Sequence, residues 1–348
     1  MKSDTQAAGN QDVLVSVVIP CRYNKEKSER LLFSCLDSVV NSSYKKLEVI
    51  VVDDGSEINL LQLLSKYPLN KRIELIQNEQ NRGYGFACNR GAAIAKGKYI
   101  CFLNDDMRAH NNMFEVLVRE MESSPEVGIL ICKEVAYDNV NRIRSVGCSM
   151  DFFGNTLPRI SNADSTYLFY APGSPSFMRR GLFLSLNGFD ETYYLYAEDL
   201  DLSWRVRLAG YDIKAAEQAI VHHMGSATIG SSSTFVSDET RLFLHKRNTL
   251  RTMEKNLSLR NLPLFITLFL FQSFSQIVFF LATHRQTFAI AIVNALVSNM
   301  RSIQSVISGR SVSQEHRLIG DDEIIRHVWP GLFLWYIFRI GFRELGVV

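Results

Sequence analysis

Two adjacent carboxylates, Glu198 and Asp199, stand between an aromatic run and the start of an amphipathic helix in the stretch 193–207. Carboxylates beside aromatic side chains lose solvation, which raises their proton affinity toward the range in which a general base is useful. A plainer interpretation is also open, in which Asp199 or Asp201 caps the helix and pairs with Arg205. The rest of the chain has to decide between a catalytic and a structural role.

A second polar cluster, Asn104 to Asp106, follows a buried strand predicted over 99–103. Side chains at i and i+2 of an extended segment point the same way and can share one divalent cation. A turn or a helix cap is the alternative. His222 and His223 leave a later strand, and a neutral imidazole is a good Mn²⁺ ligand that could complete a site begun by Asp106.

A glycine-rich turn containing Arg82 and Gly83 opens a predicted helix that carries Asn89. Free backbone N–H groups and the helix dipole at such a start suit an anion. Glycines at a helix start also serve as ordinary turn residues, so the pattern alone leaves both interpretations open.

These side chains need a sheet to bring them together. The apolar run 13–19, a helix over 28–40 and a second buried run at 47–52 form a βαβ unit, so the sheet begins parallel. In parallel sheets, ligands gather beyond the carboxyl ends of the strands. The segments 20–24 and 53–56 both follow such ends.

Alternating elements continue along the first two thirds of the chain. Helices are predicted over 60–67 and 113–122, and strands over 73–77, 127–132, 213–216 and 219–221. We expect 134–174 to be an irregular aromatic and polar insertion that could serve as a carbohydrate or acceptor surface. The polar segment 231–234 could order over a bound substrate.

Composition excludes some functions. The 348 residues carry a net charge of only +2, which gives no electrostatic argument for nucleic acid binding. The six cysteines lie in the first half without a CxxC pair, which is typical of buried, reduced thiols in a cytosolic domain. The polar stretch 1–12 predicts no secretory signal and a cytoplasmic catalytic part.

The composition changes after residue 240, so we predict two parts, 1–240 and 241–348. A basic helix over 241–260 precedes 22 uncharged residues at 262–283, and shorter apolar segments follow at 288–297 and 328–340. Basic flanks with short apolar faces favour attachment to an anionic membrane surface. A spanning helix and a buried helical domain are the alternatives, and the helices could also pair as a homo-oligomer.

Six motifs, in order, resemble family 2 inverting glycosyltransferases with a GT-A fold, specifically their rhamnosyltransferase-like branch. They are VSVVIPCRYN, VIVVDDGS, NRGYGFACNRG, FLNDDM, LNGFDETYYLYAEDLDLSWRVRLAGY and VHHMGS, and they cover about Val15 to Arg251. The resemblance implies an α/β GT-A fold, with a Rossmann-like, mainly parallel sheet flanked by helices. The C-terminal region is similar only in character to the membrane-binding tails of that branch.

The resemblance also implies a role for each matching residue. A nucleotide-sugar site is implied at Pro20, Arg22, Asn24, Asp53, Asp54, Arg82, Asn89, Asn104 and Asp105. Asp106 and His222 are implied as ligands of Mn²⁺ or Mg²⁺, with His223 as the alternative histidine. Asp199 is implied as the catalytic base beside Glu198, and Trp204 and Arg205 as acceptor-binding residues. Asn104 departs from the strict DxD pattern, and this weakens a two-carboxylate clamp.

The expected reaction moves a sugar, rhamnose or similar, from a nucleoside diphosphate sugar to a hydroxyl of a lipid-linked or cell-surface glycan. A divalent cation would neutralise the leaving diphosphate, while Asp199 takes the proton of the attacking hydroxyl, and a single displacement inverts the anomeric centre. We expect this to happen at the cytoplasmic face of the cell membrane. A catalytically inactive membrane-bound subunit is the alternative, and a nucleotidyltransferase is a third possibility.

Overall fold

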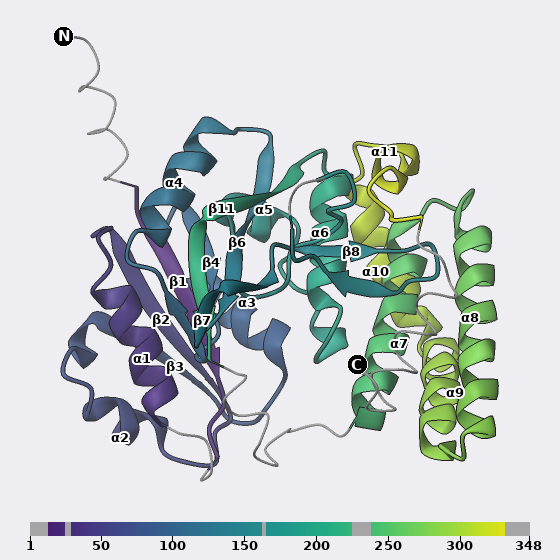
Figure 1. Cartoon of the computed structure of the whole chain (residues 1–348), viewed down its shortest axis with the longest axis horizontal. Coiled ribbons are helices and arrows are strands. Elements are labelled where there is room, and N and C mark those ends of the chain that lie inside the picture. Colours follow the sequence, from purple (N-terminus) through teal and green to yellow (C-terminus); the bar gives the residue numbers. More distant parts are fainter. Residues whose placement is uncertain (1–12, 25–28, 162–164, 225–237, 331–348) are drawn as a thin grey trace.

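The computed structural model of the chain describes residues 13–24, 29–161, 165–224 and 238–330 (Figure 1). The serine-rich segment 231–234 and most of the apolar segment 328–340 therefore lie outside the described residues. All six cysteines are buried and unpaired, which confirms the prediction of buried thiols.

One mixed sheet forms the centre of the molecule, in the order β3-β2-β1-β4-β10-β6-β11-β5. Its first half is parallel, as the βαβ pattern predicts, and two of its four strands contain the buried, β-branched runs 17–19 and 49–52. These strands are β1 (Val15–Cys21), β2 (Leu47–Asp54), β3 (Ile73–Asn78) and β4 (Tyr99–Phe102).

The second half of the sheet is mixed. Strand β10 (Ser176–Arg179) lies antiparallel between β4 and β6 (Val127–Ala136), and β11 (Asp212–His223) runs parallel to β6. The short β5 (Met107–Ala109) closes the edge antiparallel to β11. Strand β11 is one strand with an irregularity after Ala216, whereas the sequence pattern predicts two.

The expectation of an irregular insertion over 134–174 is wrong in part. Strand β6 continues to Ala136 and pairs with β7 (Asn139–Ser145), while β8 (Cys148–Met150) pairs with β9 (Thr156–Pro158). Most of β7 is exposed and polar, with asparagines and arginines at its centre, so it lacks the apolar alternation by which a strand is recognised in a sequence.

Helices cover both faces of the sheet. One face packs on α1 (Glu29–Val40), α2 (Leu60–Ser65) and α4 (Met113–Ser123) through residues such as Leu36 and Leu117. The other face packs on α3 (Tyr84–Ile94), α5 (Arg180–Ser185) and α6 (Glu198–Leu208) through Ala92, Phe183 and Val206. Two short 3₁₀ turns complete this part, η2 (Asn70–Arg72) and η3 (Glu191–Tyr193).

The C-terminal helices lie at one side of the sheet, where the first of them packs against α6 and the next three pack against the first (Figure 1). They are α7 (Asp238–Asn256), α8 (Leu262–Ala282), α9 (Gln286–Arg301), α10 (Ile303–Glu315) and α11 (Asp321–Ile325). Leu200 and Trp204 of α6 share one hydrophobic cluster with Met253 and Phe269. The two parts that we predict on either side of residue 240 therefore share a hydrophobic core.

The basic character of 241–260 is largely internal. Lys246, Arg251 and Lys255 are each at most 6% exposed, so these three cations face the protein rather than a lipid surface. Among the described residues, α8 alone is long and apolar enough to cross a membrane, and α9 and α10 form a pair bent by 70°. Only 28% of the most apolar window of α8 is buried, which distinguishes it from an ordinary core helix.

Candidate functional site

A cavity of about 190 Å³ opens at the carboxyl ends of β1 and β2. Four residues of the predicted nucleotide-sugar site line it, namely Pro20, Arg22, Asp54 and Asp105. The remaining lining comes from Cys21, Asn81, Gly83, Tyr84, Ala87, Tyr194 and Leu195. The cavity thus lies where parallel sheets place their ligands, between β1, the glycine-rich turn and the loop before α6.

Asp54 fixes the glycine-rich turn through hydrogen bonds to its backbone. Its carboxylate accepts hydrogen bonds from the backbone N–H groups of Arg82, at 3.1 Å, and Gly83, at 2.8 Å, and from the Asn78 side chain at 2.9 Å. The N–H groups that the sequence pattern offers to an anion are therefore already used by Asp54. The predicted anion-binding role of this turn is not supported at these two amides.

Gly83 is needed for the close approach of the loop before α6. Its φ is +95°, and a Cβ there would lie 2.1 Å from the carbonyl oxygen of Tyr194. The Tyr194 oxygen accepts a hydrogen bond from the Tyr84 N–H at 3.1 Å, and the Tyr194 hydroxyl lies 3.0 Å from Nδ2 of Asn81. This contact brings the aromatic stretch 193–196 to the wall of the cavity.

The other residues of the predicted nucleotide site have structural contacts. Asp53 is buried, and its oxygens accept from the Ser56 N–H at 2.9 Å and the Gln77 side chain at 3.3 Å. Asn89 makes a paired contact with the backbone N–H and C=O of Phe189, at 2.9 and 2.8 Å.

Three further predicted residues lie at other places around the cavity. Arg82 is half exposed and stacks over the Phe86 ring at 3.7 Å. The Asn104 N–H donates to Ser174 Oγ at 2.7 Å, and Asn24 follows the end of β1. None of Asn24, Asp53, Arg82, Asn89 and Asn104 is among the residues that line the cavity.

Glu198 and Asp199 begin α6, directly after the aromatic loop. Asp199 accepts hydrogen bonds from the N–H groups of Leu200, at 2.8 Å, and Gly173, at 3.0 Å. Burial raises the pKa of both carboxyls, and these hydrogen bonds oppose the rise for Asp199. The Glu198 pKa rises further because the charge of Asp199 adds to its burial.

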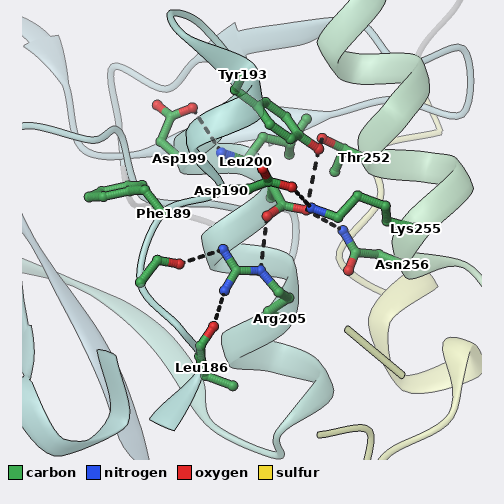
Figure 2. Close-up of polar contacts among 12 residues, drawn as sticks. Leu186, Phe189, Asp190, Tyr193, Asp199, Leu200, Arg205, Thr252, Lys255 and Asn256 are labelled. Carbon is green, nitrogen blue, oxygen red and sulfur yellow. Dashed lines mark hydrogen bonds and ion pairs between the residues drawn. The ribbon is translucent and has the colours of Figure 1, made fainter. Parts of the chain in front are cut away.

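Asp199 is joined to the cavity by one backbone unit. The Tyr84 hydroxyl, on the cavity wall, donates to the Gly173 carbonyl at 2.8 Å, while the Gly173 N–H donates to Asp199. Figure 2 shows the Asp199 carboxylate pointing away from the charged cluster around Arg205. A carboxylate with a raised pKa beside a concave site is the arrangement that a general base requires.

The loop before α6 has an unusual backbone. Tyr194, Tyr196 and Ala197 all have positive φ values, of 65°, 68° and 62°. Such conformations cost on the order of 1–3 kcal/mol each in non-glycine residues and persist only where the surroundings enforce them. Strain of this kind is frequent at active sites, and here it precedes the two carboxylates.

Trp204 and Arg205 lie inside the protein. Trp204 is 1% exposed and packs edge-on against Phe169, with ring centroids 5.1 Å apart. Arg205 bonds the Asp201 carboxylate at 2.9 Å and the carbonyls of Leu186 and Gly188 (Figure 2). This burial gives no support to an acceptor-binding role, and the i, i+4 pair of Asp201 and Arg205 confirms the structural interpretation for Asp201.

The histidine beside Asp106 is His223. Its Nε2 lies 3.1 Å from Asp106 Oδ2 and its Nδ1 lies 2.6 Å from Glu134 Oε1. Burial lowers the pKa of His223, but its hydrogen bonds to the two carboxylates more than offset this and raise the pKa to about 9. His222, the predicted metal ligand, is not the histidine in contact with Asp106, because neighbouring side chains on β11 alternate between faces. Which of the two histidines binds a metal stays a prediction.

Asp106 and His223 fit a divalent cation by their chemistry. A carboxylate and an imidazole are both ligands of Mn²⁺, and Glu134 on the far ring nitrogen would fix the ring as carboxylates do around metal-bound histidines. Within the described ranges, no group of three or more His, Cys, Asp or Glu residues forms a complete metal cage. The remaining ligands would come from phosphate and water, as is usual for Mg²⁺ at nucleotides.

Several residues of the site escape sequence reasoning. Tyr84, Tyr194 and Leu195 line the cavity, and Glu134 holds His223. The aromatic residues before Glu198 form a run in the sequence, but nothing in that run says that a left-handed backbone turns them toward β1. Glu134 carries no local signal, since its role comes from pairing across β6 and β11.

Comparison with known proteins identifies one part of the chain. The family model of glycosyl transferase family 2 matches residues 16–185. This stretch is similar to glycosyl transferase family 2 domains. It contains β1 to β10 and therefore most of the cavity, whereas Asp199 and His223 follow it.

Curated relatives share part of this chain. Glycosyltransferase GlyG of Streptococcus pneumoniae is 30% identical over 126 residues, 36% of this chain and 40% of that protein. A glucosyl-dolichyl phosphate glucuronosyltransferase of Haloferax volcanii is 28% identical over 185 residues, 51% and 56% of the two chains. The matched regions thus span about half the length of these relatives.

Solved structures extend the likeness of the family 2 domain to the fold of nearly the whole chain. S. aureus TarS, residues 1–349, has a TM-score of 0.53 at 16% identity, over 90% of both chains. A mannosyltransferase of Pyrobaculum calidifontis, in complex with GDP-Man and Mn²⁺, has a TM-score of 0.52 at 13% identity, over 94% of this chain and 89% of that one. The chain has the GT-A-like fold that the motifs predict.

Proposed function

We propose that this protein is an inverting glycosyltransferase that uses a nucleoside diphosphate sugar as donor. The observation that carries the proposal is the cavity at the carboxyl ends of β1 and β2, next to a pair of carboxyls with raised pKa. The family 2 match over 16–185 and the names of the relatives support it.

Asp199 acts as the base in this proposal. It takes the proton from an acceptor hydroxyl while the hydroxyl oxygen attacks C1 of the sugar and the bond to the diphosphate breaks. Glu198 lies beside it, 6% exposed, and burial together with the charge of Asp199 raises the pKa of Glu198, so the two carboxyls oppose each other's ionisation. One displacement by one base gives inversion.

Asp106 and His223 hold a divalent cation in this proposal. When bound, a cation there supplies positive charge against the diphosphate as it leaves. Two structures of similar fold contain Mn²⁺, one of them with GDP-Man and the other with UDP. Mn²⁺ and Mg²⁺ are both compatible with one carboxylate and one imidazole.

The donor sugar and the acceptor rest on resemblance. The rhamnosyltransferase-like motifs favour a deoxysugar such as rhamnose. A lipid-linked glycan as acceptor is favoured by the Haloferax relative, whose name refers to a dolichyl phosphate glycan. A purified protein incubated with dTDP-rhamnose, UDP-glucose or UDP-glucuronate and extracted lipid-linked glycans would identify the pair by mass spectrometry of the product.

We also propose that α8 and α10 attach the protein to the cytoplasmic face of the membrane. Phe271, Phe274 and Ile307 are 57%, 65% and 57% exposed, which is unusual for large apolar side chains. The cationic residues Arg260 and Arg301 are exposed in the same region, which favours anionic lipid. Flotation with phosphatidylglycerol vesicles should capture the protein, and Phe271→Ser with Phe274→Ser should release it.

Leu61→Ser is the control for the vesicle experiment, because Leu61 is 60% exposed on α2, which covers the sheet far from α8. Equal capture of the Phe271 and Phe274 double variant and the wild type would contradict attachment through α8. An alkaline wash separates two forms of attachment, since it removes interfacial protein and leaves a spanning helix in the vesicles.

The experiment that tests the enzyme itself is calorimetric titration of UDP, GDP and dTDP, with and without Mn²⁺, on the wild type and on Asp106→Ala. We expect one nucleotide to bind in a metal-dependent manner and Asp106→Ala to lose most of that dependence. Absence of binding for all three nucleotides would instead favour the alternative, a catalytically inactive membrane-bound subunit that serves as an interaction module.

A further inference from the structure

Asn248 of α7 makes an unusual set of contacts with the loop that precedes the two carboxylates. Its side-chain amide nitrogen lies within hydrogen-bond distance of three backbone carbonyl oxygens, those of Tyr193 at 3.0 Å, Leu195 at 2.9 Å and Tyr196 at 2.7 Å. The side chain is 0% exposed. A single residue of the C-terminal region thus contacts three backbone carbonyls of the strained loop.

The amide is held in this orientation from its other side. Oδ1 of Asn248 accepts a hydrogen bond from Nε of Arg247 at 2.8 Å, so the carbonyl oxygen of the amide faces the guanidinium and the nitrogen faces the loop. Arg247 Nη2 also donates to the Tyr193 carbonyl at 3.0 Å. The Tyr193 hydroxyl and Thr252 Oγ1, one turn along α7, lie 2.8 Å apart.

These contacts account for a backbone that would otherwise be unfavourable. Positive φ occurs at Tyr194, Tyr196 and Ala197, in a loop whose carbonyls at 193, 195 and 196 converge near one point. Carbonyl oxygens that converge repel one another unless a donor lies between them. The Asn248 amide is that donor. Neither an apolar side chain nor a carboxylate could replace it, because one lacks N–H groups and the other adds negative charge.

The loop has two functions that depend on its shape. Tyr194 and Leu195 line the cavity, and Ala197 immediately precedes Glu198 and Asp199. A shift of about 1 Å in a reacting group can cost about 10²-fold in rate. Whatever fixes the loop therefore fixes both the donor pocket and the base.

We propose that Asn248 is a positioning residue for sugar transfer, which places Asp199 and the wall formed by Tyr194 and Leu195 through the two N–H groups that its amide shares among three loop carbonyls. The proposal rests on the proposed function for its kinetic part. It makes helix α7 a component of the active site, although Asn248 lies beyond residue 240 and touches neither donor nor base.

The test compares Asn248→Ala and Asn248→Ser with Thr249→Val. Thr249 is the next residue on α7, equally buried, and its Oγ1 has no hydrogen-bond partner among the described residues. We expect kcat to fall about 10²-fold in Asn248→Ala, less in Asn248→Ser, which keeps one donor, and not at all in Thr249→Val. KM for the donor should rise with the fall in kcat, because a mere loss of folded enzyme lowers kcat and leaves KM unchanged.

Hydrogen exchange measured by mass spectrometry gives a second, activity-free test. Peptides that cover 193–199, and the Tyr84 amide bonded to the Tyr194 carbonyl, should exchange faster in Asn248→Ala, while peptides from β1 and β2 stay as in the wild type. A wild-type enzyme that transfers no sugar, combined with this local change, would overturn the proposed function and leave the positioning of the loop supported. An active wild type, with Asn248→Ala equal to Thr249→Val in kcat, KM and exchange, would overturn the inference.

Discussion

Nζ of Lys255 lies 2.9 Å from Oδ1 of Asp201, and this buried ion pair joins α7 to the helix that begins with Glu198 and Asp199. Asp201 is 0% exposed and also bonds Arg205 at 2.9 Å and Asn256 at 2.9 Å (Figure 2). Burial alone would raise the Asp201 pKa, but Lys255 and Arg205 outweigh it and hold that pKa well below its usual range. The charge of Lys255 on α7 thus stabilises the first turn of α6 through Asp201.

Replacing Lys255 should destabilise the protein strongly. Lys255→Met removes a cation from the buried carboxylate of Asp201 and the partly exposed carboxylate of Asp190. Breaking a buried pair such as that with Asp201 costs about 3–5 kcal/mol. Lys214→Met is the control, because Lys214 forms an exposed ion pair with Glu126, and such pairs contribute about 0–1 kcal/mol. Urea denaturation measures both, and equal midpoints would contradict the role of the buried pair.

Asp199→Asn should abolish transfer without unfolding the protein. The amide keeps the shape of the side chain but cannot accept the hydroxyl proton, so we expect a loss of about 10²- to 10⁴-fold in kcat. Thermal unfolding and nucleotide affinity should stay near the wild-type values. Asp138→Asn, in an exposed pair with Arg142, is the control for loss of a carboxylate elsewhere. A tenfold or smaller loss in Asp199→Asn would exclude it as the base.

Glu198 should make stability depend on pH in the opposite sense to most carboxyls. Its folded-state pKa is raised, so the folded protein binds the proton more tightly than the unfolded chain does. Ionisation therefore destabilises the fold above the raised pKa, and stability increases as pH falls toward the ordinary value of about 4.3. Glu198→Gln should raise the melting temperature in mildly alkaline buffer and leave it unchanged in acid; a lower melting temperature in alkali would contradict this.

The two adjacent histidines provide a matched pair of variants. His223 contacts Asp106, whereas burial, His110 and Arg108 lower the pKa of His222. His223→Ala should weaken Mn²⁺-dependent nucleotide binding at least tenfold, and His222→Ala should leave it within about twofold of the wild type, as expected for loss of one metal ligand against loss of none. Calorimetry on both variants measures the two affinities. A larger loss in His222→Ala than in His223→Ala would identify His222 as the metal ligand, as the motif implies.

The parallel half of the fold could be predicted because its signals are local. Apolar runs such as 15–19 and 47–52 bury both faces, and polar residues follow each of them at the carboxyl ends. The resemblance implies a nucleotide-sugar site that includes Pro20, Arg22, Asp54 and Asp105, and in the structure these four residues line one cavity.

The remaining parts depend on pairing that is not local. Whether Lys246 and Lys255 meet lipid or buried carboxylates depends on how α7 packs, and a count of charges cannot reveal it. Arg205 has the sequence context of a functional residue, yet its guanidinium is used entirely by Asp201 and two carbonyls. Asn248 has no motif of its own, because its three partners lie more than fifty residues earlier in the chain.

The irregularity in β11 has a consequence for how the metal ligand is encoded. Strand β11 advances from Ala216 to Ile220 while β6 advances only from Cys132 to Lys133, so the extra residues 217–219 set which side chains face which way afterwards. Inserting one residue here, with the strand before the bulge kept in place, would move every later side chain by one position and turn it to the other face. His222 would then occupy the position of His223 and face Asp106. The length of the bulge thus decides which of the two adjacent histidines contacts Asp106.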